Sequence, residues 1–146
     1  MGTLLALGLL LPLFGFGLNR IFGSANRLGV RLMGPMAVLA SFACFAIAAV
    51  SGGGGHTDFS LYRWIDQPAG VVAALPVPAI DLDLFFDPLA AVMTLVITGV
   101  GFLIHAYASG YMEEESEADY ARFFAHMNLF VFSMLLLVLA RNFVFL

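Results

Sequence analysis

The chain has 146 residues, of which 62% are hydrophobic and only 11% are charged, and its formal net charge is -4. Its mean hydropathy is +0.98. Soluble domains carry roughly a quarter of charged residues, so this composition excludes a soluble globular domain and is typical of an integral membrane protein. No basic patch with interleaved aromatic residues is present, so we expect no nucleic acid partner. The one cysteine, Cys44, excludes a disulfide framework and a multi-cysteine zinc or iron–sulfur site.

Two apolar helices are predicted at the start of the chain, over about residues 2–22 and 33–50, each long enough to cross a ~30 Å hydrocarbon core. No basic region precedes the first apolar run, which favours a retained helix over a cleaved signal peptide. Small residues recur on one face of the first helix and favour close helix packing, namely Gly8, Pro12, Gly15 and Asn19. The predicted connection between the two helices is a short Gly/Ser/Asn loop that has no acidic residue and carries three arginines: Arg20, Arg27 and Arg31.

A long loop follows the second helix and spans residues 51–86, opening with a glycine run at 52–55. Near its end apolar and acidic residues alternate, in the order Ile80, Asp81, Leu82, Asp83 and Leu84. This period of two is typical of a strand with one apolar face. Together with the aromatic stretch around Trp64, it predicts a small β-hairpin within residues 59–86, lying at the membrane surface with Trp64 at head-group depth.

The third predicted helix, residues 88–112, carries polar and small residues along one face of an otherwise apolar segment. Their spacing of three or four residues places them on that face: Thr94, Thr98, Gly101, His105 and Ser109. Lipid penalises a polar face, so we expect it to point toward protein or buried water. Asp87 and Pro88 precede the helix in the order of a capped helix start, with the carboxylate near the positive end.

A fourth helix is predicted over about residues 120–141, after a solvated acidic turn that contains Glu113 and ends at Asp119. The predicted fold is therefore an all-α integral membrane protein with four transmembrane helices. Because the last residues contain no helix stop, we expect residues 1–146 to form a single membrane domain that is the N-terminal fragment of a longer protein. The distribution of arginines between the loops predicts that the N-terminus and the loop 51–86 lie outside the cytoplasm.

His105 is the residue whose role matters most, because an ionisable group inside a membrane helix indicates function. An imidazole titrates in the physiological range and could act as a proton relay. The alternative is a histidine that donates one hydrogen bond and never changes charge. The remaining candidates for a proton path or polar network are Thr94, Thr98, Asp87, Arg122 and His126. For Asp87 the alternative is helix capping, and for Arg122 and His126 it is a place at the membrane interface.

Two stretches together resemble a known family. DPLAAVMTLVITGVGFLIHAYASGYM (87–112) and YARFFAHMNLFVFSMLLLVLA (120–140) are similar to the start of subunit L (chain 5) of bacterial NADH-quinone oxidoreductase. The large subunit of multisubunit sodium/proton antiporters is a weaker resemblance. Arg141 departs from the family pattern, which usually has an acid or a small polar residue there. The positions that match the family pattern are Asp87, Pro88, Gly99, Gly101, His105, Tyr107, Tyr111, Met112, Arg122, Phe123, Phe124 and Asn128.

The resemblance implies an antiporter-like subunit in the membrane arm of respiratory complex I, multi-pass in the inner (plasma) membrane of a bacterium. Its partners would be the other membrane-arm subunits and the lipid bilayer. The resemblance implies that partner subunits bind NADH, FMN, iron–sulfur clusters and quinone, and that this chain itself holds no cofactor or metal. It also implies that this chain is a subunit of a translocase and carries out no catalytic chemistry of its own. Two alternatives stay open: a subunit of a Na+/H+ antiporter, and a packing or assembly segment with no direct proton role.

Overall fold

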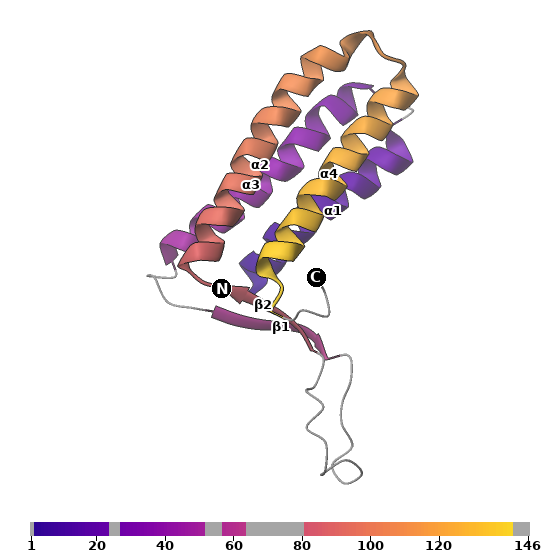
Figure 1. Ribbon diagram of the computed structural model, residues 1–146. Helices are drawn as coiled ribbons and strands as arrows, with labels where there is room; N and C mark the ends of the chain where they lie inside the picture. Colours follow the sequence, from indigo (N-terminus) through magenta and orange to yellow (C-terminus); the bar gives the residue numbers. More distant parts are fainter. Residues whose placement is uncertain (1, 24–26, 52–56, 64–80, 142–146) are drawn as a thin grey trace, which may run out of the picture.

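A computed structural model describes residues 2–23, 27–51, 57–63 and 81–141. These residues contain four long helices that run side by side (Figure 1). They are α1 (Gly2–Phe22), α2 (Arg27–Ser51), α3 (Pro88–Tyr111) and α4 (Glu117–Leu139). All four are long and apolar enough to cross a membrane. The predicted all-α membrane fold is therefore confirmed.

The helices form an antiparallel bundle in which α1 packs against α2 and α4, and α3 packs against α2 and, less extensively, α4. The interior is filled by apolar side chains that are almost fully buried, including Leu5, Val38, Phe45 and Leu135. Large apolar side chains also cover the outside of each helix, for example Phe14, Val96 and Phe130. A helix bundle that is apolar on the outside as well as the inside is suited to a lipid environment.

A small β-sheet closes one end of the bundle, where α2 ends and α3 begins (Figure 1). Strands β1 (Thr57–Arg63) and β2 (Asp81–Phe86) pair antiparallel, with a register irregularity between Ser60 and Tyr62. The predicted alternation is confirmed at Leu84, which is buried, and at Asp83, which is partly exposed, and it continues with Phe86 buried. Trp64 and the glycine run at 52–55 lie outside the described residues, and the placement of this sheet at the membrane surface stays a prediction.

Helix α2 begins earlier than predicted, at Arg27 instead of residue 33. Arg27 and Arg31 are therefore part of the helix and not of the loop, and Pro35 lies inside the helix rather than in its first turn. Pro35 suggested a helix start because the N–H groups of a first helical turn have no partner within the helix, so a proline at that position removes no hydrogen bond. An interior proline disrupts the hydrogen bond to the carbonyl four residues earlier, which transmembrane helices tolerate.

Helix α4 was predicted over 120–141 and both ends differ from that prediction. It begins at Glu117 because Ser116 caps it, with the Asp119 N–H donating to Ser116 Oγ at 3.3 Å. It ends at Leu139, where Ala140 turns into an extended conformation with ψ of 125° and forms a bridge with Leu84. A short 3-10 turn, η1 (Met112–Glu114), follows α3. Strand pairing with β2, rather than a local stop signal, therefore ends α4.

Candidate functional site

The polar face predicted for α3 points into the bundle. The buried residues of this helix are Ala90, Ala91, Thr94, Thr98, Gly101, His105 and Ala108. Both neighbouring helices pack closely at Gly101, because a Cβ added there would lie 3.2 Å from Val131 Cγ2 of α4 and 3.5 Å from Val38 Cγ1 of α2. The three residues Thr94, Thr98 and His105 therefore share one interior face, as their spacing predicted.

Both threonine hydroxyls on this face are bonded to the backbone of their own helix. Thr94 Oγ1 donates to the Ala91 carbonyl at 3.0 Å, and Thr98 Oγ1 donates to the Thr94 carbonyl at 2.6 Å. This back-bonding satisfies the hydroxyl hydrogen of a buried threonine without a partner from another helix. Each oxygen keeps acceptor capacity, so the face can still accept hydrogen bonds.

His105 is fully buried, and its two ring nitrogens have different surroundings. Nδ1 lies 2.7 Å from the Gly101 carbonyl oxygen. A carbonyl can only accept, so Nδ1 carries the hydrogen, and Nε2 of the neutral ring is an acceptor. Nε2 has no hydrogen-bond partner among the described residues, and the ring packs against that of Phe124 at a centroid distance of 5.8 Å. The site thus presents one buried basic nitrogen inside an apolar bundle.

Two buried asparagines lie in the same interior and were not among the predicted site residues. Asn19 of α1 and Asn128 of α4 are 1% and 0% exposed. Asn128 Nδ2 donates to the Phe124 carbonyl at 3.0 Å, whereas its Oδ1 and both amide atoms of Asn19 have no partner among the described residues. A Cβ added to Gly34 would lie 3.5 Å from both amide nitrogens, so the two side chains meet at this glycine. An amide inside an apolar helix was the signal available in the sequence, where Asn19 was assigned to helix packing.

The other predicted site residues do not join this face. Asp87 caps α3, with the Ala90 N–H donating to Asp87 Oδ1 at 2.6 Å, and it lies ~27 Å along the helix from His105. Arg122 is exposed and pairs with Asp119 at 3.7 Å. His126 is also exposed, with Nδ1 2.6 Å from the Arg122 carbonyl. Their positions agree with the alternatives of capping and of a place at the helix surface. Within the described residues, no three His, Cys, Asp or Glu side chains are grouped so as to hold a metal ion.

Comparison with known proteins identifies the family. The family described as NADH-Ubiquinone oxidoreductase (complex I), chain 5 N-terminus, matches residues 76–124. NADH-quinone oxidoreductase subunit L of Pseudomonas aeruginosa is 40% identical over 99% of this chain. The proteins of that name from Escherichia coli K12 and Mycobacterium tuberculosis H37Rv are each 38% identical, over 96% and 93% of this chain. The chain belongs to the chain 5, or subunit L, family. It spans about a fifth of the length of these relatives, 23%, 22% and 21% respectively.

The family match covers β2, the whole of α3 and the first part of α4. It therefore includes the buried polar face with Thr94, Thr98 and His105. It also includes Phe124, whose ring packs against His105.

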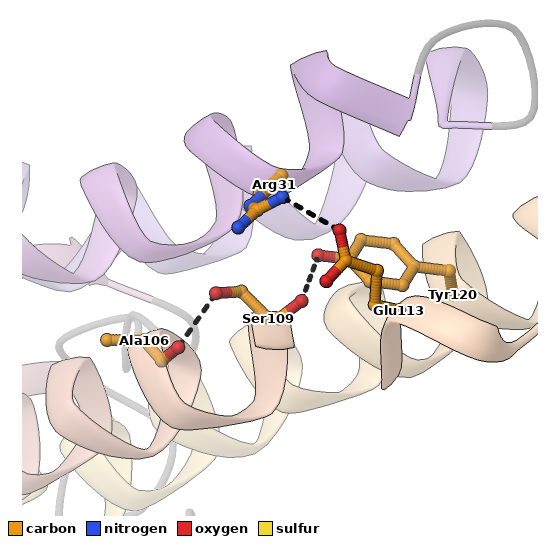
Figure 2. Close-up of polar contacts among 5 residues, drawn as sticks. All are labelled: Arg31, Ala106, Ser109, Glu113 and Tyr120. Carbon is orange, nitrogen blue, oxygen red and sulfur yellow. Dashed lines mark hydrogen bonds and ion pairs between the residues drawn. The ribbon is translucent and has the colours of Figure 1, made fainter. Parts of the chain in front are cut away.

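A second group of polar contacts in this family member joins the ends of α2, α3 and α4 (Figure 2). Arg31 Nη1 lies 3.4 Å from Glu113 Oε1, which connects α2 to η1. Tyr120 OH donates to the Ser109 carbonyl at 3.3 Å, and Ser109 Oγ donates to the Ala106 carbonyl at 2.7 Å. The turn that contains Glu113 is exposed, as predicted, and Glu113 in addition forms an ion pair with a residue 82 positions away in the sequence.

Proposed function

We propose that this chain is part of the membrane arm of a proton-pumping NADH:quinone oxidoreductase in a bacterial inner membrane. It contributes to proton translocation, while partner subunits bind NADH, FMN, iron–sulfur clusters and quinone and carry out the electron transfer. The proposal rests on the subunit L relatives, which align with 93% or more of this chain. In this arrangement the N-terminus lies on the extracytoplasmic side, as the positions of the arginines favour.

The observation that carries the proton role is the buried Nε2 of His105. A membrane helix rarely retains an ionisable group unless that group has a function. With Nδ1–H held by the Gly101 carbonyl, Nε2 is the nitrogen that can accept a proton or a hydrogen bond from water. Thr98 lies two turns away on the same face, ~10 Å along α3. Its oxygen offers a further acceptor toward the middle of the helix.

A packing role is the second candidate, and a specific observation favours it. Both threonine hydroxyls and His105 Nδ1 are already bonded to the backbone of α3. The imidazole also fills space beside the Phe124 ring. In this alternative the polar face stabilises the bundle, and no proton passes along it.

The test is His105→Gln in the intact complex, with His126→Gln as the matched control on the outer surface. Glutamine keeps a polar side chain of similar length but does not titrate. We expect His105→Gln to lower the number of protons pumped per NADH oxidised in proteoliposomes, while NADH oxidation per assembled complex persists. His126→Gln leaves both unchanged. An unaltered pumping ratio in His105→Gln, with or without a lower yield of complex, establishes the packing role instead.

Co-purification separates the proposal from the Na+/H+ antiporter alternative. A subunit of the respiratory complex is recovered together with nicotinamide- and quinone-binding subunits. An antiporter subunit is recovered without them, and the activity of its vesicles depends on a sodium gradient rather than on NADH. Recovery without the nicotinamide- and quinone-binding subunits, together with sodium-dependent vesicle activity, contradicts the proposed function.

A further inference from the structure

The end of the bundle where α2 begins and α3 ends contains a pocket of about 300 Å³. It is lined by Leu28, Arg31, Ser109, Glu113 and Tyr120. Figure 2 shows the polar side of this pocket, where the Arg31 guanidinium and the Glu113 carboxylate face each other. Their side chains are 47% and 64% exposed, so both charges remain accessible from outside the bundle.

The charges of this pocket define what it can bind. An exposed ion pair with an N–O distance of 3.4 Å is weak, so an incoming ligand can replace it at little cost. The matching ligand offers a phosphate oxygen to the guanidinium and an ammonium hydrogen to the carboxylate. A ligand with net negative charge fits less well, because further exposed carboxylates follow Glu113 along the chain: Glu114, Glu115, Glu117 and Asp119.

A separate apolar groove lies farther along the seam between α2 and α3. It has a volume of about 320 Å³ and is lined largely by Leu39, Phe42, Leu95, Gly99, Phe102 and Leu103. Phe102 and Gly99 lie ~10 Å and ~15 Å below Ser109 along α3, which reaches the middle of a ~30 Å hydrocarbon core. A Cβ added to Gly99 would lie 3.4 Å from Phe42 Cε2, so the glycine leaves the groove open without being required for packing.

Aromatic residues place the pocket at the level of lipid head groups. Tyr107 and Tyr111 lie within one helical turn of Ser109 along α3, on another face of the helix, and are 74% and 75% exposed. Their rings stack on each other with a centroid distance of 6.2 Å. Exposed tyrosines at the end of a transmembrane helix are typical of the membrane–water interface. A polar pocket at that interface above an apolar groove has the two-part character of a phospholipid.

We propose that the α2–α3 seam binds one phospholipid whose head group carries both a phosphate and a primary ammonium. Arg31 binds the phosphate and Glu113 binds the ammonium. One acyl chain lies in the groove over Phe42 and Gly99. The residues proposed to bind the lipid do not include His105, so a negative result for lipid binding leaves the proposed proton role untouched.

The test measures lipid retention by the full protein. The purified protein is exchanged into an equal mixture of phosphatidylethanolamine, phosphatidylcholine and phosphatidylglycerol, and retained lipid is identified by native mass spectrometry. We expect phosphatidylethanolamine to be retained in preference to the other two, because it alone offers a net neutral head with ammonium hydrogens. Arg31→Gln and Glu113→Gln each reduce its retention roughly three- to tenfold, the range expected for one charge-assisted hydrogen bond in an exposed site.

Matched variants make the test specific. Arg20→Gln and Glu114→Gln each remove a charge of the same sign near the same end of the bundle but outside the pocket, and they leave retention unchanged. Gly99→Leu fills the groove and reduces retention, whereas Gly17→Leu, at a glycine with nothing within 4 Å of its added Cβ, does not.

Several results overturn the proposal. Preferred retention of phosphatidylglycerol contradicts the charge argument, and equal losses in the control variants contradict the location. Loss in only one of the two charge variants contradicts binding at two points. Complete displacement by soluble phosphoethanolamine assigns the pocket to a free phosphate compound. Absence of retained phosphatidylethanolamine from the unaltered protein assigns the seam to another protein segment.

Discussion

Replacing Gly15 with alanine tests how closely α1 and α2 pack. A Cβ added to Gly15 would lie 2.8 Å from Ala37 Cβ, ~0.7 Å short of a normal carbon–carbon contact of ~3.5 Å. Both carbons are attached directly to the helix backbones, so no side-chain rotation relieves the overlap and the two helices must separate. Overpacking of this kind costs about 1–3 kcal/mol.

Gly17 provides the matched control on the same helix. Nothing lies within 4 Å of the position of its added Cβ, so Gly17→Ala removes only the entropic cost of a helical glycine. We expect that variant to gain about 0.5–1 kcal/mol. Both substitutions make the same chemical change and share the same entropic gain, so their stabilities should differ by the overpacking cost alone, about 1–3 kcal/mol.

The assay is equilibrium unfolding of the purified protein in mixed micelles, titrated with a denaturing detergent and followed by circular dichroism. The midpoint for Gly15→Ala should lie below that of the unaltered protein and the midpoint for Gly17→Ala at or above it. Equal midpoints for the two variants would refute the close approach of α1 and α2 at Gly15.

Two further predictions concern helix ends. Asp87→Ala removes the oxygen that accepts the Ala90 N–H at 2.6 Å and should destabilise α3 by about 0.5–2 kcal/mol, seen as faster amide exchange at Ala90. Asp87→Asn keeps the acceptor and should exchange slowly, and rapid exchange in both variants would show that the cap does not depend on this oxygen. Arg141→Pro removes the N–H that donates to the Asp83 carbonyl at 3.1 Å, and should loosen β2 by about 0.5–1.5 kcal/mol, measured as faster exchange in that strand. Arg141→Ala keeps this N–H and serves as the control. If amide exchange in β2 is accelerated equally in Arg141→Pro and Arg141→Ala, the effect comes from the arginine side chain and not from the N–H.

The sequence alone was sufficient for the features that depend on neighbours along the chain. Apolar length determines that a segment can span a membrane, and residues 2–22 form α1 as predicted. Spacing of three and four determines which residues share a helix face, so Thr94, Thr98 and His105 were placed together correctly. The cap at Asp87 was predicted for the same reason, because its partner N–H lies three residues away.

Helix ends governed by distant contacts could not be predicted in this way. Nothing near Ala140 in the sequence indicates that α4 stops there, because the stop comes from strand pairing with Leu84. Likewise, Arg31 and Glu113 lie 82 residues apart, and only the packing of α2 against α3 and η1 brings their side chains together. Before that contact was known, Glu113 could be interpreted only as part of a solvated turn.

The surroundings of the candidate site were also decided by tertiary structure. Periodicity shows that His105 faces inward, but it cannot show that Phe124 of α4 lies against the ring or that Nε2 lacks a partner among the described residues. It also cannot show that Asn19 and Asn128, from the first and last helices, meet at Gly34. Local hydrogen bonds and helix periodicity act over three or four residues, and so the sequence determines them. Contacts between helices depend on how four separate segments pack, and that is settled only when the bundle forms.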